Sequence, residues 1–118
     1  MERPSYISVE PVVSHVLPDP KRPNAIATAE IKVGPSDRGW LCAISVSAPA
    51  SGRFEPLGYW SDYPPRRTFP DLNAALAGAI ADLRAWLGHD GAEPIRARVL
   101  AWLDSLNPAQ PDLFGAAP

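Results

Sequence analysis

A change of hydrophobic period near residue 68 is the strongest constraint on how this chain folds. Before it, apolar residues alternate with polar ones, which places successive side chains on opposite faces of a strand. After it, apolar residues recur every three or four positions, as they do along one face of an α-helix. The chain therefore combines a strand-forming first half with a helix-forming second half, an order typical of an α+β domain.

Four alternating runs in the first half predict four strands. The first contains Pro11, which lacks the amide proton of a ladder bond and so favours an edge strand or a bulge. Short connections rich in proline and glycine separate the runs, and such connections favour an antiparallel meander. The four expected strands are Ile7–Leu17, Ala25–Val33, Trp40–Ala48 and Phe54–Tyr63.

Two helices are expected in the second half. The first covers residues 72–87, with Thr68 as its cap and Asp71 three residues later, in the manner of a capping box. The second begins near Pro94 and ends before Asn107. The predicted fold class is therefore α+β, an antiparallel meander of about four strands followed by two helices packed on one face.

Length and composition limit what this protein does. A chain of 118 residues is the size of one domain, expected here over residues 1–107, with a flexible tail over 108–118. The net charge of −2 provides no overall cationic field for nucleic acid or membranes. A single cysteine, Cys42, leaves no internal disulfide, and no leader-like or membrane-spanning run is recognised, so a cytoplasmic location and no membrane partner are expected.

The end of the chain, AQPDLFGAAP, contains two large apolar residues among Pro, Ala, Gly and polar ones. It resembles the peptide Gln-x-[Asp/Ser]-[Leu/Met]-Phe, by which many bacterial replication, repair and mobile-element proteins bind the DNA polymerase sliding clamp. The resemblance covers five of the 118 residues. It implies that Gln110 hydrogen-bonds in a small polar subsite, and that Leu113 and Phe114 fill an apolar pocket. Asp112 matches the third, often acidic, position, whereas Pro111 stands where leucine is frequent in stronger versions.

Physical chemistry supports the same interpretation of the tail. A terminal peptide does not fold alone, but each large side chain that it buries in a partner contributes about 1.5–3 kcal/mol before ordering costs. The chain is then a non-enzymatic accessory protein tethered to the sliding clamp in DNA replication, repair or mobile-element biology. The alternative is that Leu113 and Phe114 pack on the chain's own surface, which leaves a small structural or regulatory protein-binding domain. That domain would form a homodimer through a strand edge or the region of Trp86 and Trp102.

Residues suited to catalysis are few. The only histidines, His15 and His89, are isolated in sequence, and Cys42 falls on the apolar side of its expected strand. No metal-ligand spacing and no phosphate-binding glycine loop is recognised. Asp82 is best explained by the polar face of the first helix. We therefore expect no enzymatic activity, no cofactor and no bound metal.

A third hypothesis is weak binding of single-stranded nucleic acid. Lys21 and Arg22 share one expected loop, while Arg66 and Arg67 share another, close in sequence to Trp60 and three further aromatic residues. Aromatic side chains beside arginines can stack on unpaired bases while the cations contact phosphates. The competing interpretation is that these aromatic residues build the core and that the arginines only solvate loops.

Overall fold

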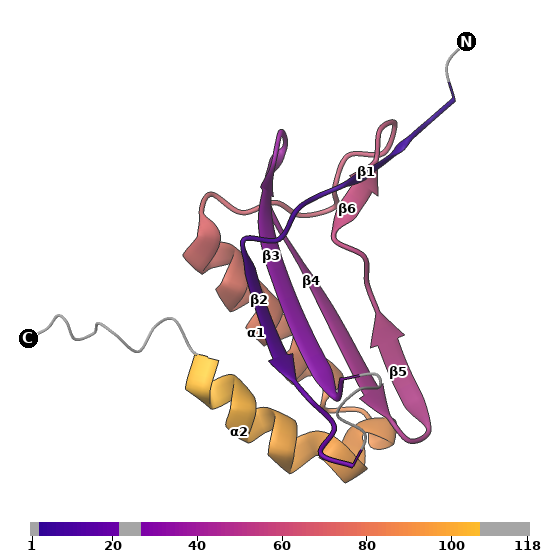
Figure 1. Cartoon of the computed structure of the whole chain (residues 1–118), viewed down its shortest axis with the longest axis vertical. Helices are drawn as coiled ribbons and strands as arrows, with labels where there is room; N and C mark the ends of the chain where they lie inside the picture. Colours follow the sequence, from indigo (N-terminus) through magenta and orange to yellow (C-terminus); the bar gives the residue numbers. More distant parts are fainter. Residues whose placement is uncertain (1–2, 22–26, 107–118) are drawn as a thin grey trace, which may run out of the picture.

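The computed structural model describes residues 3–21 and 27–106. Six strands come first and two α-helices follow, joined by a 3₁₀ helix, which confirms the predicted α+β class (Figure 1). The elements are β1 (Tyr6–Ser8), β2 (Val13–Leu17), β3 (Ala29–Ser36), β4 (Gly39–Ala48), β5 (Ser51–Phe54), β6 (Gly58–Trp60), α1 (Leu72–Trp86), η1 (Asp90–Ile95) and α2 (Arg96–Leu106).

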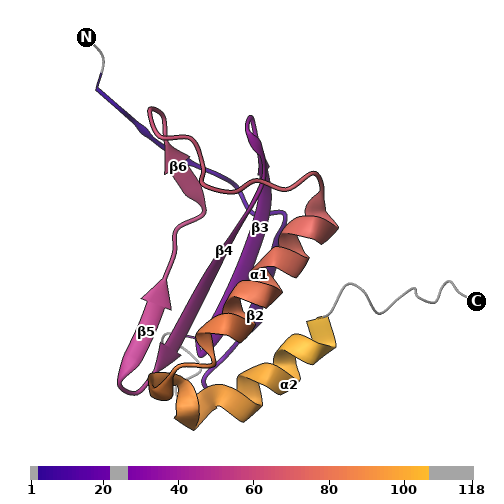
Figure 2. The same cartoon turned by 180° about the vertical axis from the view of Figure 1, so that it is seen from behind.

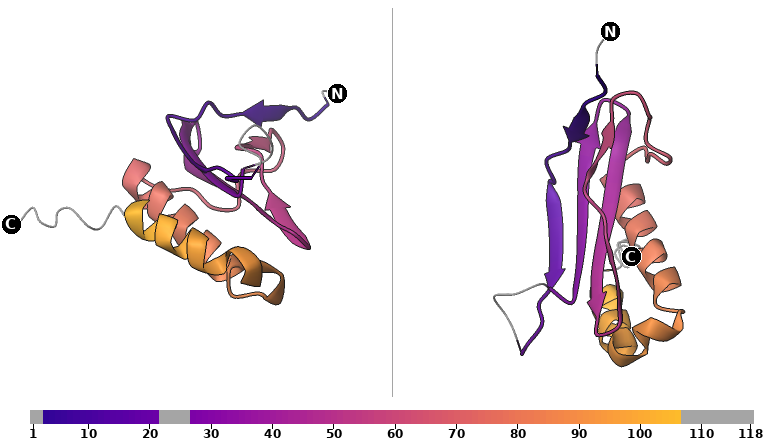
Figure 3. Two further views of the ribbon diagram at one scale, coloured as in Figure 1. Left: turned by 60° about the horizontal axis from the view of Figure 1, so that its bottom comes forward. Right: turned by 90° about the vertical axis from the view of Figure 1, so that its right-hand side faces the viewer.

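Four strands form the main sheet in the order β2-β3-β4-β5, and every neighbouring pair is antiparallel. This is the predicted meander. Both α-helices lie on the same face of the sheet, with α1 running along β3 and β4 (Figures 2 and 3). β1 and β6 pair with each other in a separate two-stranded sheet, with Ile7 opposite Tyr59.

The main core lies between the sheet and the helices. Alternation along β4 predicts its helix-facing side correctly, because Ile44 and Val46 are buried there while Trp40 and Cys42 are half-buried against the same core. Buried side chains at helical spacing complete the core from above. Those contributed by the helical half are Ala75, Leu76, Ala79, Ile80, Leu83, Leu87, Ala92, Val99 and Leu103.

Two predicted strands are each divided by a proline. The first breaks around Pro11 into β1 and β2. The last, expected over Phe54–Tyr63, contains only the final residue of β5 and all of β6, which lie on either side of Pro56. A proline amide cannot donate a ladder bond, so the chain leaves the main sheet at both places. The two detached ends then pair as β1 and β6, and a bond from the Val9 amide to the Leu57 carbonyl (2.9 Å) extends their pairing. We call residues 6–9 together with 57–60 the N-terminal arm.

The N-terminal arm covers part of the sheet face opposite the helices. Val9, Leu57 and Tyr59 of the arm are buried there against Leu41 and Ala43 of β4. Alternation along the expected third strand gave no reason to bury these two β4 residues. One end of β4 is therefore covered on both faces. Alternation of apolar and polar residues predicts a strand that is buried on one face only.

The cap of α1 is Asp71, not Thr68. The Asp71 carboxylate accepts a hydrogen bond from the Ala74 amide (2.8 Å), and the helix begins at Leu72. Phe69 forms a β-bridge with Trp40 through two backbone bonds of 2.9 and 3.0 Å, which keeps the chain extended after Thr68. The predicted capping box is therefore wrong, because tertiary pairing holds residues that local sequence would place in the first turn.

Candidate functional site: the edge groove

An open groove of about 900 Å³ lies where β5 ends and the chain moves away from β4 toward β6. The floor comes from β4, one wall from α1, and the other from the segment between β5 and α1. We call it the edge groove. Its lining residues are Leu41, Cys42, Arg53, Glu55, Gly58, Tyr59, Trp60, Tyr63, Pro64, Pro65, Arg66, Arg67, Phe69, Asp82, Ala85 and Trp86.

The backbone of β4 changes partners along this groove. The Ile44 carbonyl accepts a hydrogen bond from the Glu55 amide. The Trp40 amide and carbonyl both form hydrogen bonds with the backbone of Phe69. Strand geometry directs the amides of residues two apart toward the same edge. The Cys42 backbone, midway between these two residues, therefore faces the groove. Between the contacts at Ile44 and Trp40, Cys42 is therefore the one residue of β4 whose backbone groups point toward this edge.

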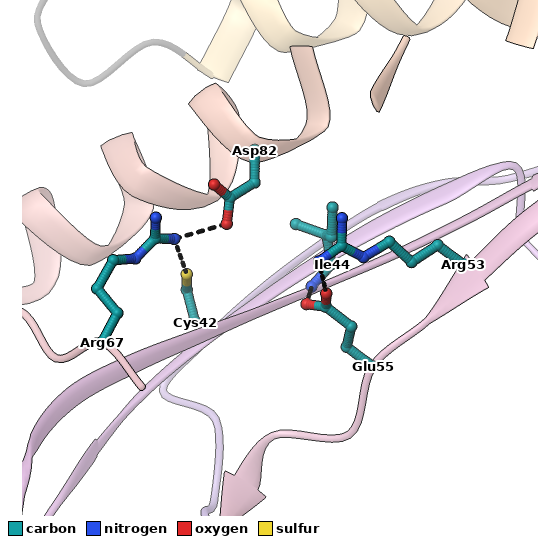
Figure 4. A network of polar contacts seen from close by, with 6 residues as sticks. All are labelled: Cys42, Ile44, Arg53, Glu55, Arg67 and Asp82. Carbon is teal, nitrogen blue, oxygen red and sulfur yellow. Dashed lines mark hydrogen bonds and ion pairs between the residues drawn. The ribbon is translucent and has the colours of Figure 1, made fainter. Parts of the chain in front are cut away.

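Glu55 occupies the hydrogen-bonding groups of Ile44 at one end of this edge. Its carboxylate accepts a hydrogen bond from the Ile44 amide (3.0 Å) and forms an ion pair with Arg53 (Figure 4). Arg53 and Glu55 are two residues apart, so the period of an extended chain places them on the same side. Most of the Glu55 charge is thus already matched by neighbours within the protein.

Arg67 is held by three different groups. Its guanidinium donates to the Asp82 carboxylate (2.6 Å) and to the Cys42 sulfur (3.9 Å), as Figure 4 shows, and it lies 4.9 Å from the centre of the Phe69 ring. Asp82 stands on α1 and Cys42 on β4, so the arginine joins the helix to the sheet. The predicted polar helix face of Asp82 thus carries a specific ion pair. Because these groups are partly exposed, that pair contributes at most about 1 kcal/mol of stability.

Burial raises the pKa of the Cys42 thiol above its ordinary value, and the hydrogen bond from Arg67 offsets this only in part. The reactive form of cysteine is the thiolate, whose fraction at a given pH falls as the pKa rises. At neutral pH the thiol is therefore mainly protonated in the folded chain. This environment suits a packing residue more than a nucleophile.

Alkylation of Cys42 tests this environment directly. We expect the rate of reaction with iodoacetamide to rise with pH along a curve whose midpoint is higher in the folded chain than in denaturant, because burial disfavours the thiolate. The rate is measured across the alkaline range by mass spectrometry. Steric access changes the plateau but not the midpoint. A folded-state midpoint at or below the unfolded one would contradict the assignment.

The outer rim of the groove is aromatic and cationic. Trp60 is 50% exposed and Tyr63 is 70% exposed, and a β-bridge holds the two residues together. The Trp60 and Tyr6 rings pack in a T-shaped arrangement, with ring centres 5.4 Å apart. Arg66 is exposed beside them and forms no ion pair among the residues that the structure describes.

The structure brings together three of the five residues expected to contact nucleic acid. Trp60, Arg66 and Arg67 all line the edge groove. Lys21 lies near Ser47, at the opposite end of β4 from Cys42, and belongs to a different surface depression. Arg22 lies outside the described residues, as do the four expected clamp-binding residues Gln110, Asp112, Leu113 and Phe114.

The sequence predicts no site that includes Arg53 or Glu55, and it places Trp86 only in a candidate dimer contact with Trp102. A weak signal for the first two existed, since opposite charges two residues apart in an extended segment point to the same side. Trp86 approaches the groove only because α1 packs across β4, which no local pattern specifies.

Outside the groove, the two histidines occupy ordinary positions. His15 is half-buried on the edge strand β2, while exposed His89 precedes η1 and lies 3.3 Å from the Ser51 hydroxyl. Within residues 3–21 and 27–106, no three His, Cys, Asp or Glu side chains are grouped as metal ligands would be. Nor does this part of the chain contain a helix with the length and apolar character needed to cross a membrane.

Comparisons with protein-family models, with curated proteins and with solved structures find no significant match to this chain.

Proposed function

We propose that this chain is a non-enzymatic accessory protein that binds the DNA polymerase sliding clamp through residues 110–114 and serves DNA replication, repair or mobile-element biology. The observation that carries the proposal is a run of five residues that follows α2, which ends at Leu106: Gln110, Pro111, Asp112, Leu113 and Phe114. Tethering raises the local concentration of the folded part near DNA.

The surface of the helices supports a partner for this peptide. Val99 and Leu103 of α2 are fully buried in the main core. In the part of the chain that the structure describes, the large exposed hydrophobic side chains lie before residue 64, and none lies on α1 or α2. Leu100, Trp102 and Leu106 of α2 are half-buried against the main core, so the described helices leave a following peptide no strongly exposed large apolar side chain to cover. This favours burial of Leu113 and Phe114 in another protein.

Titration of the full chain against a purified bacterial sliding clamp tests the proposal. We expect saturable binding with a dissociation constant of about micromolar order. The double substitution Leu113→Ala and Phe114→Ala should weaken binding at least about tenfold, because both side chains lose their apolar burial. Calorimetry or surface plasmon resonance measures the affinity.

Two matched variants of the tail serve as controls. Changing Ala116 and Ala117 to serine alters residues beyond the motif and should leave the affinity unchanged. Pro111→Leu introduces the residue frequent at this position and should tighten binding. The proposal fails if the chain does not bind, or if the double alanine variant binds like the parent. Burial of the Phe114 side chain on the chain's own surface, in the absence of clamp, would instead support the self-packed alternative.

A further inference from the structure

The rim of the edge groove exposes two aromatic side chains, Trp60 and Tyr63, whose backbone is fixed by a hydrogen bond between them. Tyr63 donates its amide to the Trp60 carbonyl (3.0 Å), and Pro64 and Pro65 follow directly, which limits the backbone freedom of the segment. The Trp60 ring also packs in a T-shaped contact with Tyr6. Aromatic faces that are exposed and already positioned lose little conformational entropy when a planar ligand stacks on them.

The net charge of the groove lining is opposite in sign to the net charge of the whole chain. Three arginines and two carboxylates line it, a net charge of +1, whereas the complete sequence carries −2. Each carboxylate is matched by its own arginine, Glu55 by Arg53 and Asp82 by Arg67. Among the residues that the structure describes, Arg66 is the groove arginine without an ion-pair partner, and it is therefore the cation that a ligand would meet. The site therefore complements a flat group joined to a single negative charge.

The geometry of the β4 edge disfavours an added peptide strand. Strand addition gains affinity from a row of main-chain hydrogen bonds. Here the Glu55 contact at Ile44 and the Phe69 bridge at Trp40 leave only the Cys42 backbone facing the groove. A peptide would add one bridge at most, which is too little pairing to order an extended segment.

We propose that the edge groove binds an unpaired segment of nucleic acid, with bases stacked on Trp60 and Tyr63 and a backbone phosphate bound by Arg66. Stacking platforms next to cations are how proteins hold single strands without reading their sequence. The guanidinium of Arg66 suits a phosphate because it presents several donors in one plane. This site is separate from the clamp-binding peptide, and it would place the tethered protein on single strands that become exposed next to a clamp.

Fluorescence anisotropy of the full chain with a labelled oligothymidylate, at low ionic strength and without clamp, tests the inference. Saturable binding stronger than to a duplex of equal length is expected. Tyr63→Ala should weaken binding about 5- to 100-fold through loss of one stacked base, and Tyr63→Phe should bind like the parent. Because Tyr63 is 70% exposed, the alanine variant should keep the parent's circular dichroism and melting temperature.

Salt dependence isolates the phosphate contact. Arg66→Ala should reduce the slope of log affinity against log salt by about one, because one fewer counterion is released. Arg38→Ala removes an equal charge from an exposed residue outside the groove and should leave the slope unchanged. The Leu113→Ala and Phe114→Ala chain should bind the oligonucleotide like the parent, so this test is independent of the clamp.

Three outcomes would overturn the inference. One is the absence of saturable binding to the single strand at low ionic strength. Another is binding that Tyr63→Ala and Arg66→Ala leave unchanged. The third is a groove that ignores oligonucleotides but binds a labelled proline-rich peptide with loss of affinity in Tyr63→Ala, which would assign the aromatic platform to a protein partner.

Discussion

Replacing Leu83 by alanine is expected to lower the free energy of unfolding by about 2–5 kcal/mol, the range for removing a large aliphatic side chain from a packed core. Leu83 is 0% exposed and lies in the middle of the main core, where α1 packs on β3 and β4. The rigid sheet below it cannot close fully over the vacated volume, so lost contacts add to the lost transfer free energy.

Urea or thermal unfolding followed by circular dichroism measures this loss. Asn73→Ala, at an exposed position of the same helix, is the matched control and should change stability by less than about 0.5 kcal/mol. A domain of this size has about 5–15 kcal/mol of total stability, so Leu83→Ala removes a large share of it. A loss below about 1 kcal/mol would show that Leu83 is not packed as described.

Gly58→Ala is expected to cost about 1–3 kcal/mol, as overpacking at a close contact does. A β-carbon at this position would lie 2.3 Å from the Ile7 carbonyl oxygen and 2.7 Å from the Tyr6 hydroxyl. The first of these is a backbone atom of the paired strand β1, so β1 and β6 must separate for alanine to fit. The N-terminal arm should then detach from Leu41 and Ala43, while the four-stranded sheet remains.

Amide hydrogen exchange distinguishes detachment of the arm from general unfolding. The amides of Val9 and Ser61, which bond across the arm, should lose protection in Gly58→Ala, while those of the β3 and β4 ladder keep theirs. Gly88→Ala is the control and should leave the protection of Val9 and Ser61 unchanged. Its added carbon has no atom of the arm within 4 Å, and the nearest atom to it is the Ala85 oxygen at 3.3 Å. Retained protection at Val9 and Ser61 would contradict the close packing of Gly58. Because β6 carries Trp60, this variant should also weaken oligonucleotide binding.

Much of the fold could be predicted because its periods are local. The alternation of Ala29, Ile31 and Val33 is a property of neighbouring residues, and the structure buries all three. Helices α1 and α2 follow from apolar spacing in the same way. The failures at Pro11 and Pro56 occur where a missing amide proton interrupts the ladder and the detached ends pair with each other. The failure at Thr68 occurs where the bridge between Trp40 and Phe69 keeps the chain extended beyond the expected cap.

The candidate site could be predicted only in part. Arg66, Arg67 and Trp60 were grouped correctly because they are close in sequence. Lys21 was grouped with them by charge alone, and the register of the sheet places it at the other end of β4. The partnership of Arg67 with Asp82 and Cys42 joins three elements, and no short stretch of sequence contains it.

The sequence by itself determined the α+β class, the meander and the helix-facing side of β4, and it contains near its end a peptide that resembles a clamp-binding motif. Each of these depends on residues that are neighbours or on a fixed short period. Only the tertiary structure decided that β1 pairs with β6, that both faces of β4 are covered at one end, and that an aromatic and arginine-lined groove opens there. Those features join residues from separate parts of the sequence, as far apart as Tyr6 and Trp60, and the balance of packing over the whole chain selects them.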